Sequence, residues 1–252
     1  MEIGVQISSL KPLLTTREQV PQAFAKVRAL GCTAVQLQWI DPAVPVADIA
    51  QALAASGLRS VSVQDFFQHV QGNLPYYRDL NEVTGGTWLC VSRIPQTCKS
   101  RQGLEEFARQ LEALEAQVPG QRLCFHPVYD DYTALPGENA VDLLMGRLPG
   151  LSLCLDLYHL GRYCPDMPGY LRRWAGRVPM VHFKDSRDGR LVPAGQGQTN
   201  WDGVVAACLE TGVGYGFVEQ ETWEGDPYLC LKAAMTWLEA QIEQAGGKAD
   251  GI

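Results

Sequence analysis

The chain has 252 residues, of which 46% are hydrophobic and 19% are charged. A chain of this length and composition buries about three quarters of its unfolded surface in one core, which excludes disordered and fibrous classes. Its 28 acidic and 21 basic residues give a formal charge of −7, and a negative surface repels nucleic acid and anionic membranes. We therefore expect no nucleic-acid partner and no membrane partner.

The N-terminal segment and the cysteines indicate in which cellular compartment the protein is expected to lie. The first residues, Met-Glu-Ile-Gly-Val-Gln-Ile, lack the basic and apolar regions of a secretory signal. No apolar run reaches the roughly 18 to 20 residues of a membrane span. The eight cysteines include no Cys-x-x-Cys pair, so we expect reduced, packed thiols rather than disulfides or zinc. These features predict a soluble, cytoplasmic protein.

Short apolar segments alternate with longer helical patterns along the chain. The predicted strands cover residues 2–7, 34–38, 59–64, 87–93, 122–126, 151–156, 180–183 and 215–219. The predicted helices cover residues 17–30, 46–56, 74–84, 102–117, 138–147, 167–176, 201–211 and 227–244. Within the fourth helix, Leu104, Phe107, Ala108, Leu111 and Leu114 share one stripe that is expected to pack in the core.

This alternation predicts the fold. Near-continuous apolar strands that alternate with helices indicate a parallel sheet covered on both faces. Eight such units in about 250 residues favour a closed barrel over an open sheet. No Gly-x-Gly-x-x-Gly follows a strand, so the phosphate loop of many open sheets is missing. We predict an α/β fold, a single (β/α)8 TIM barrel over residues 1–245, with a flexible C-terminal tail at 246–252.

In such barrels the active site lies at the carboxyl ends of the strands. The predicted fifth strand leads to Asp131, the sixth ends in Asp156, the seventh contains His182 and the eighth ends in Glu219. These residues would place three carboxylates and one imidazole around one point. Oxygen-rich ligation with one imidazole suits a divalent ion such as Mn²⁺, Mg²⁺, Co²⁺, Fe²⁺ or Zn²⁺. We therefore predict one divalent metal ion held by these four residues.

Each of these residues also has a structural alternative. Asp156 could instead cap a helix, His182 could be a hydrogen-bonded core histidine, and Glu219 could face solvent, as Glu221 is expected to do. At the fifth strand, Asp130 could take the place of Asp131.

Four segments resemble the xylose isomerase-like barrel family of sugar phosphate isomerases and epimerases. They are Ile3-Gly4-Val5-Gln6-Ile7, Leu155-Asp156-Leu157-Tyr158-His159, Val181-His182-Phe183-Lys184-Asp185, and the stretch from Gly195-Gln196-Gly197 through Asn200-Trp201 to Val218-Glu219-Gln220-Glu221. The resemblance implies a single metal held by carboxylates on the fifth, sixth and eighth strands and a His on the seventh. It also implies that His159 and Lys184 face the substrate, and that the protein can form a homo-oligomer.

The fifth strand departs from the family pattern. Many members carry His-Asn-His-x-x-Glu there, whereas this chain reads His126-Pro127-Val128-Tyr129-Asp130-Asp131. Asp is about 1.5 Å shorter than Glu, which fits a ligand better than a general base. The third strand ends in Gln64, where many members have His. We place His126 and Gln64 among the substrate contacts, and Asp131 and Glu219 as the two carboxylates that remove and return a proton.

The leading hypothesis is a metal-dependent isomerase or epimerase of a small polyhydroxy ketone or aldehyde, which acts through a metal-bound enediolate. The alternatives are a dehydratase of a keto-inositol or dehydroshikimate-like substrate, and a barrel that binds a sugar or metal without turnover. An apurinic endonuclease is disfavoured, because it needs several metals and many His ligands, and the chain has four histidines.

Some aromatic and basic residues are weaker candidates. Trp39 and Trp223 follow the second and eighth strands and could stack on a sugar, although packing roles are the more common alternative. Arg93, together with Arg187 or Arg190, could hold a phosphate or carboxylate of the substrate, although solvent-facing roles are an equal alternative.

Overall fold

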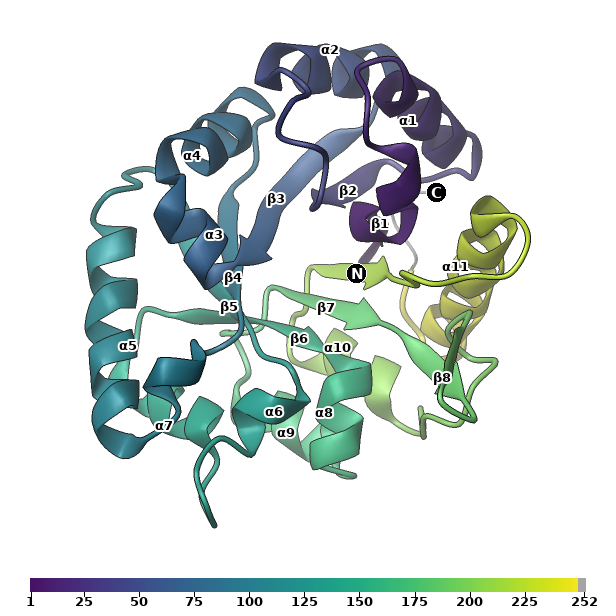
Figure 1. The fold of residues 1–252 in the computed structure, drawn as a ribbon. Helices are drawn as coiled ribbons and strands as arrows, with labels where there is room; N and C mark the ends of the chain where they lie inside the picture. Colours follow the sequence, from purple (N-terminus) through teal and green to yellow (C-terminus); the bar gives the residue numbers. More distant parts are fainter. Residues whose placement is uncertain (249–252) are drawn as a thin grey trace.

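The computed structural model describes residues 1–248. Within them, eight parallel strands close into one barrel in the order β1-β10-β7-β6-β5-β4-β3-β2, as Figure 1 shows. These strands are β1 (Glu2–Gln6), β2 (Ala34–Leu37), β3 (Arg59–Phe66), β4 (Trp88–Ser92), β5 (Arg122–His126), β6 (Ser152–Asp156), β7 (Met180–Phe183) and β10 (Tyr215–Val218). The predicted (β/α)8 barrel is confirmed.

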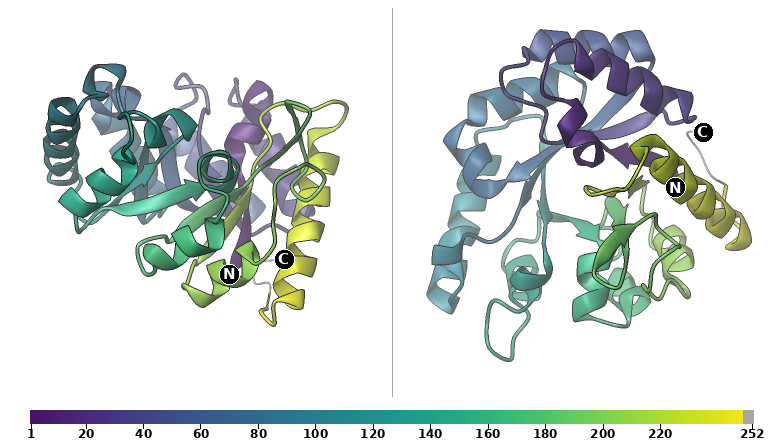
Figure 2. Two further views of the ribbon diagram at one scale, coloured as in Figure 1. Left: turned by 90° about the horizontal axis from the view of Figure 1, so that it is seen from below. Right: turned by 45° about the vertical axis from the view of Figure 1, so that its right-hand side comes forward.

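The larger helices surround the barrel in Figures 1 and 2, and α11 packs against β1 and β10. They are α1 (Gln19–Ala29), α2 (Val46–Ser56), α4 (Leu74–Val83), α5 (Arg101–Glu115), α7 (Ala140–Arg147), α9 (Met167–Arg173), α10 (Val204–Glu210) and α11 (Pro227–Gln244). The bounds of α2, α11, β5 and β7 match the predicted segments, and the other predicted ends lie within three residues.

Several short elements were not predicted, and each follows the carboxyl end of a barrel strand. They are η1 (Ile7–Leu13), α3 (Phe67–Gly72), η2 (Gln96–Cys98), α6 (Tyr129–Tyr132), α8 (Leu157–Tyr163) and the antiparallel hairpin of β8 (Asp185–Arg187) and β9 (Arg190–Val192). These pieces are too short to give a periodic sequence signal. They build the rim of the barrel mouth, where the candidate site lies.

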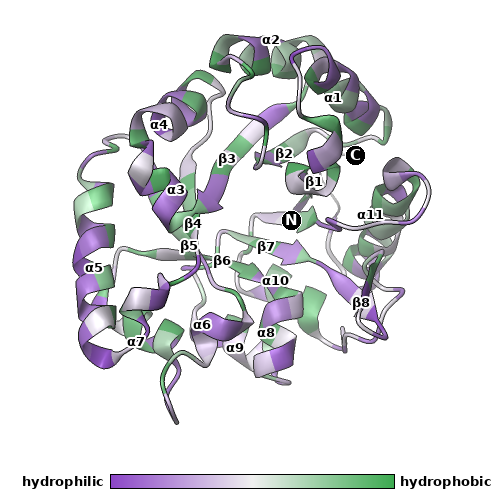
Figure 3. Ribbon diagram, viewed as in Figure 1, coloured by the Kyte–Doolittle hydropathy of each residue, from purple (hydrophilic) through white to green (hydrophobic). Residues whose placement is uncertain are grey.

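The main core lies between the barrel and the helices. The predicted stripe of α5 is buried, and the ring of Phe107 meets the rings of Phe67 and Phe125 at 4.9 and 5.8 Å between centroids. The hydroxyl of Ser100 caps this helix, because it accepts a hydrogen bond from the amide of Gly103 at 3.0 Å. Figure 3 shows the resulting alternation of hydrophobic and hydrophilic bands along the outer helices.

The barrel interior has an apolar layer and a polar layer. The apolar layer contains Ala34, Val61, Trp88, Cys90, Cys124, Cys154, Met180 and Phe217. Gly4 is required beside it, since a Cβ there would lie 2.6 Å from the ring of Phe217. In the polar layer, the Gln6 amide donates to Gln36 at 2.7 Å, and the Gln36 amide donates to Ser62 at 2.8 Å. Buried amides thus link the interior faces of β1, β2 and β3.

All eight cysteines are free, six of them buried, as predicted. No helix in the described part of the chain has the length and apolar character that a membrane crossing requires. The extent of the predicted domain stays a prediction. Of the predicted tail, residues 249–252 lie outside the described residues.

Candidate metal centre

Four side chains converge where β5, β6, β7 and β10 end. His126 and Asp156 are the last residues of β5 and β6, His182 lies in β7, and Glu219 directly follows β10. Each offers one ligand atom, and these four atoms all lie within 4.8 Å of one another. All four residues are buried. We call His126, Asp156, His182 and Glu219 the four-residue centre.

Asp156 combines the two roles considered for it. One carboxylate oxygen, Oδ1, caps α8 by accepting hydrogen bonds from the amides of Tyr158 at 2.9 Å and His159 at 3.1 Å. The other oxygen, Oδ2, is buried and has no hydrogen-bond partner among the described residues. A buried carboxylate oxygen without a partner is costly. The cap therefore fixes the side chain and leaves one oxygen free for a cation.

His182 is oriented by the barrel interior beneath it. Its Nε2 lies 2.5 Å from the side-chain oxygen of Gln36 and 3.2 Å from the sulfur of Cys154. With the Nε2 proton donated to Gln36, Nδ1 is the nitrogen directed at the centre, and it presents a lone pair there once the ring is neutral. Nδ1 lies 3.0 Å from Glu219 Oε2 and 3.1 Å from His126 Nε2. Either a proton on Nδ1 or a bound cation satisfies these close polar atoms.

The charges of the centre depend on one another. Burial alone would raise the pKa of Glu219, but the positive charges of Lys184 and His182 outweigh it and hold this pKa well below its usual range. Burial also opposes protonation of His182, yet Cys154 and Glu219 outweigh it and raise its pKa. Burial and the neighbouring His182 lower the pKa of His126 to about 3. The neutral His126 and the ionised Glu219 are in the protonation states that a metal ion requires of its ligands. His182, whose raised pKa favours the protonated form, would release its Nδ1 proton on binding a metal ion.

Lys184 and His159, predicted to face the substrate, both lie beside Asp156. The Lys184 ammonium is 3.9 Å from Asp156 Oδ2, and His159 Nε2 is 3.7 Å from the same oxygen. Lys184 also forms an ion pair with Glu221, whose side chain is only 23% exposed. The expectation that Glu221 faces solvent is therefore wrong. Burial and the nearby charge of Glu219 raise the pKa of Glu221 to about 7.

The structure does not bring Asp131 into the four-residue centre. Its two carboxylate oxygens accept hydrogen bonds from the backbone amides of Ile94 at 3.0 Å and Val128 at 2.9 Å, and Lys99 lies 3.6 Å away. This side chain fastens the loop after β5 to the loop after β4. The alternative, Asp130, is exposed. The fifth strand contributes His126 instead, which the sequence predicts as a substrate contact.

Two other predicted contacts lie apart from the centre. Gln64 is buried at the end of β3, where its amide donates to the side-chain oxygen of Gln38 at 3.2 Å. Arg190 lies in β9, is 81% exposed and pairs with Glu224 at 3.3 Å. Arg190 therefore has no contact with the centre.

The segment from Gly195 to Trp201 has a structural role. Asp185 is fully buried, and its carboxylate accepts hydrogen bonds from the amides of Ser186, Gly195, Gly197 and Thr199 and from the indole of Trp201. A Cβ on Gly197 would lie 2.0 Å from Asp185 Oδ1. This loop closes around Asp185 and so fixes the chain that follows Lys184.

Sequence reasoning missed the residues that support the centre from below. They include Gln36 and Cys154 beneath His182, and Ser8, whose hydroxyl donates to Glu219 Oε1 at 2.8 Å. Of these residues, Gln36 could be identified from the sequence. A polar residue within the predicted apolar strand 34–38 needs a hydrogen-bond partner inside the barrel.

The fold and the centre define a class of protein, a parallel (β/α)8 barrel that gathers imidazole and carboxylate groups at the carboxyl ends of its strands. The sequence model of the xylose isomerase-like TIM barrel family matches residues 79–241, and the chain belongs to this family. None of the curated proteins compared with the chain matches its sequence.

Solved structures share this fold at low sequence identity. A sugar phosphate isomerase/epimerase from Parabacteroides distasonis is 17% identical, with a TM-score of 0.75 over 94% of this chain and 96% of that one. L-ribulose 3-epimerase is 16% identical, with a TM-score of 0.74 over 98% and 96%. A probable 3-DHS dehydratase from Bacillus anthracis is 15% identical, with a TM-score of 0.70 over 94% and 98%. These identities show a common fold.

Proposed function

We propose that the chain is a divalent-metal-dependent isomerase or epimerase of a small polyhydroxy ketone or aldehyde. The observation that carries this proposal is the four-residue centre, with its ligand atoms within 4.8 Å of one another and Asp156 Oδ2 buried without a hydrogen bond. The epimerase and isomerase among the structures of the same fold support the reaction class.

His126, Asp156, His182 and Glu219 would hold the metal ion. Two imidazoles with two carboxylates favour Mn²⁺, Fe²⁺, Co²⁺ or Zn²⁺ over Mg²⁺, which prefers oxygen ligands and water. The bound ion supplies Lewis acidity, which makes the proton between a carbonyl and a hydroxyl carbon easier to remove.

The proton is removed by Glu219. Asp156 uses one oxygen to cap α8, whereas Glu219 is ionised and its Oε1 accepts a hydrogen bond from the Ser8 hydroxyl. Lys184, whose pKa is raised by Glu219, Asp156 and Glu221 in spite of its burial, stays protonated and donates to a substrate oxygen. His159 is kept neutral, since burial lowers its pKa, and its buried Nδ1 has no partner among the described residues. It is placed to move a proton between neighbouring oxygens.

A single carboxylate base on one face of the substrate favours isomerisation over epimerisation. The two-carboxylate mechanism expected from the sequence required Asp131 on the opposite face, but Asp131 binds the amides of Ile94 and Val128. With Glu219 as the base, the proton is removed and returned on the same face of the substrate. This arrangement suits proton transfer between adjacent carbons of a ketose and an aldose better than inversion at one carbon.

A dehydratase is the second candidate. Lys184, Glu221 and His159 form a group of proton donors beside Asp156, and such a group can protonate a departing hydroxyl. A probable 3-DHS dehydratase also shares this fold. The two reactions start with the same proton removal and differ in their products, because dehydration gives a conjugated enone that absorbs ultraviolet light.

The test begins with the metal content of the purified protein. About one divalent ion per chain, with loss of the ion from an Asp156→Asn variant, would support the centre. The loaded protein is then incubated with a panel of ketoses and keto-inositols in deuterated water and followed by NMR and ultraviolet absorbance. Deuterium uptake without absorbance indicates isomerisation, and a rise in absorbance indicates dehydration. Retained metal without either change would leave a sugar- or metal-binding barrel.

A further inference from the structure

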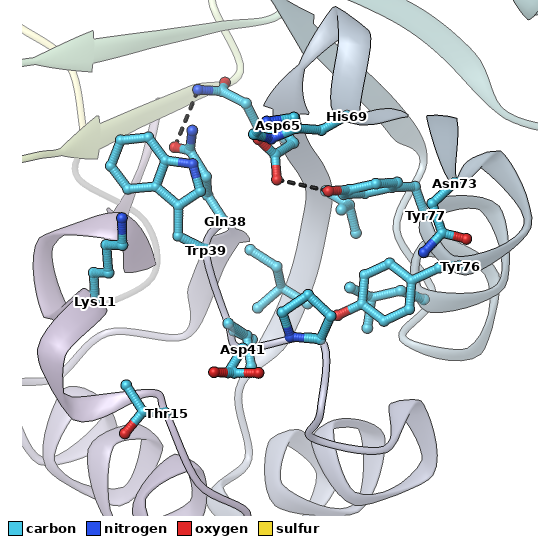
Figure 4. Close-up of a pocket in the computed structure, with 16 residues that line it drawn as sticks. Lys11, Thr15, Gln38, Trp39, Asp41, Asp65, His69, Asn73, Tyr76 and Tyr77 are labelled. Atoms are coloured by element: carbon cyan, nitrogen blue, oxygen red, sulfur yellow. Dashed lines mark hydrogen bonds and ion pairs between the residues drawn. The ribbon is translucent and has the colours of Figure 1, made fainter. Parts of the chain in front are cut away.

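A second cavity opens at the same end of the barrel, beyond β2 and β3. Its volume is about 430 Å³, within the range of small-molecule sites. Figure 4 shows Trp39 and Lys11 on one side of it and Tyr76 and Tyr77 on the other. We call this cavity the aromatic pocket. Its lining residues include none of the four-residue centre, so the two are separate regions of the barrel mouth.

Trp39 is held in a costly conformation at the wall of the aromatic pocket. Its φ is 57°, in the left-handed region, where a bulky residue costs about 1–3 kcal/mol. The ring of Phe66 packs against the indole at an angle of 65°, with 5.9 Å between the ring centroids. Backbone strain of this kind is concentrated at sites that contact ligands. The indole is therefore a candidate for a ligand contact.

The indole of Trp39 already attracts a cation. The Lys11 ammonium lies 4.7 Å from the ring centroid, which is within the range of a cation–π interaction. Lys11 is exposed, and its long flexible side chain can turn into solvent when another cation approaches. The Lys11 ammonium thus marks a position that the ammonium group of a ligand can take.

Two carboxylates give the aromatic pocket a negative potential. Asp41 and Asp65 both line it, whereas Lys11 is the one Lys or Arg among its lining residues. Burial, together with the charges of Asp65 and Asp41, raises the pKa of Tyr76 to about 12, so the field of both carboxylates reaches this wall. Such a field repels an anion such as a phosphate and attracts a cation.

Hydrogen-bond acceptors of the pocket are available to a ligand. Gln64 is 2% exposed, and its side-chain oxygen Oε1 has no hydrogen-bond partner among the described residues, although its amide nitrogen donates to Gln38 at 3.2 Å. Asp41 accepts a hydrogen bond from the Ala43 amide at 2.8 Å on one oxygen, Oδ1. A buried acceptor without a partner is costly. The N–H groups of an ammonium ion would supply donors to these oxygens.

We propose that the aromatic pocket binds a small organic ammonium ion that carries an apolar or aromatic group. The ammonium group displaces Lys11 from Trp39, and the charge of Asp41 neutralises it. The apolar group packs against Leu37 and Val63, which also line the pocket. This binding site is additional to the proposed function and needs no metal ion at the four-residue centre.

The test measures the binding of three probes of similar size by calorimetry at pH 7. They are 2-phenylethylamine, which is a cation, 2-phenylethanol, which is neutral, and phenylacetate, which is an anion. We expect the amine to bind about tenfold or more tighter than the alcohol, and phenylacetate to bind most weakly. Equal affinities for the amine and the alcohol, or no binding of the amine, would overturn the inference.

Two substitutions assign the effect of charge to the pocket. Asp41→Asn keeps the shape of the side chain and removes its charge, so it should weaken binding of the amine by about tenfold and leave the alcohol unchanged. Lys11→Met removes the competing ammonium, so it should tighten binding of the amine. Asp130→Asn is the matched control, because Asp130 is an exposed carboxylate at the same end of the barrel and lines a different cavity.

The outcomes separate this site from other sources of binding. An equal loss of amine affinity in Asp41→Asn and Asp130→Asn, or no gain in Lys11→Met, would contradict the inference. Removal of bound metal with a chelator should leave the affinity for the amine unchanged. Loss of amine binding on this treatment would place the amine at the four-residue centre and would also contradict the inference.

Discussion

The two halves of the barrel mouth use different chemistry. Where β5, β6, β7 and β10 end, the buried polar groups are imidazoles, carboxylates and the Lys184 ammonium. Where β2 and β3 end, they are mainly the amides of Gln36, Gln38 and Gln64, beside aromatic rings. The first half can change charge and move protons, and the second can contact a ligand without doing so. The titratable cluster and the amides with aromatic rings therefore occupy opposite halves of the mouth, and Gln36 of β2 contacts His182 of the first half.

The largest expected effect is the loss of metal from the first half. Asp156→Asn removes a charged ligand, and we expect metal affinity to fall by more than about 100-fold, beyond the range seen for hydrogen-bond partners of ligands. Asn is also a good helix N-cap, so α8 should be retained. Metal titration with a competing chelator measures the affinity. Asp185→Asn is the control, since Asp185 is an equally buried carboxylate that binds backbone amides.

The next effect tests whether β2 joins the two halves. Gln36→Leu removes the acceptor for His182 Nε2, and with it the contact that turns Nδ1 toward the centre. We expect metal affinity to fall by about 10 to 100-fold. The same titration checks this, with Gln38→Leu, two residues further along the chain, as the matched variant. Equal losses in the two variants would contradict a specific role of Gln36.

A third prediction concerns Asp131, the carboxylate that lies outside the centre. Asp131→Asn weakens its hydrogen bonds to Ile94 and Val128, and we expect the free energy of unfolding to fall by about 1–3 kcal/mol. Metal content should not change. Urea denaturation and elemental analysis measure the two quantities, and loss of the metal from a folded variant would return Asp131 to the ligand set.

The position of Asp131 in the structure shows what the sequence could and could not predict. The barrel followed from the alternation of strands and helices, and Asp156, His182 and Glu219 followed from their positions at strand ends. The sequence predicts Asp131 as the carboxylate of the fifth strand, whereas His126 is the residue that ends this strand. The direction in which a side chain points after a strand depends on contacts with loops that are distant in the sequence. The hydrogen bond from the Ile94 amide to Asp131 is such a contact.

The same limit applies to the other half of the mouth. Trp39 was a candidate for sugar stacking, yet its left-handed backbone and its contact with Lys11 have no signal in the sequence. The elements that build the rim, such as η1 and α3, are too short to show a period. Sequence pattern therefore predicted the scaffold and the polar strand ends, whereas the pocket depends on packing between separate loops.

The smallest expected effect is a pH dependence of stability in the second half, at Tyr76. Burial, together with the charges of Asp65 and Asp41, raises the pKa of Tyr76 to about 12, against about 10 in the unfolded chain. The folded state holds this proton more tightly, so its contribution to stability is complete below pH 10 and is lost as pH rises toward 12. At pH 11 the loss is about 1 kcal/mol.

Tyr76→Phe cannot ionise and should lack this part of the alkaline loss. Urea denaturation at pH 8 and pH 11 compares the two proteins, and parallel losses would show that the Tyr76 hydroxyl ionises as freely in the pocket as in water.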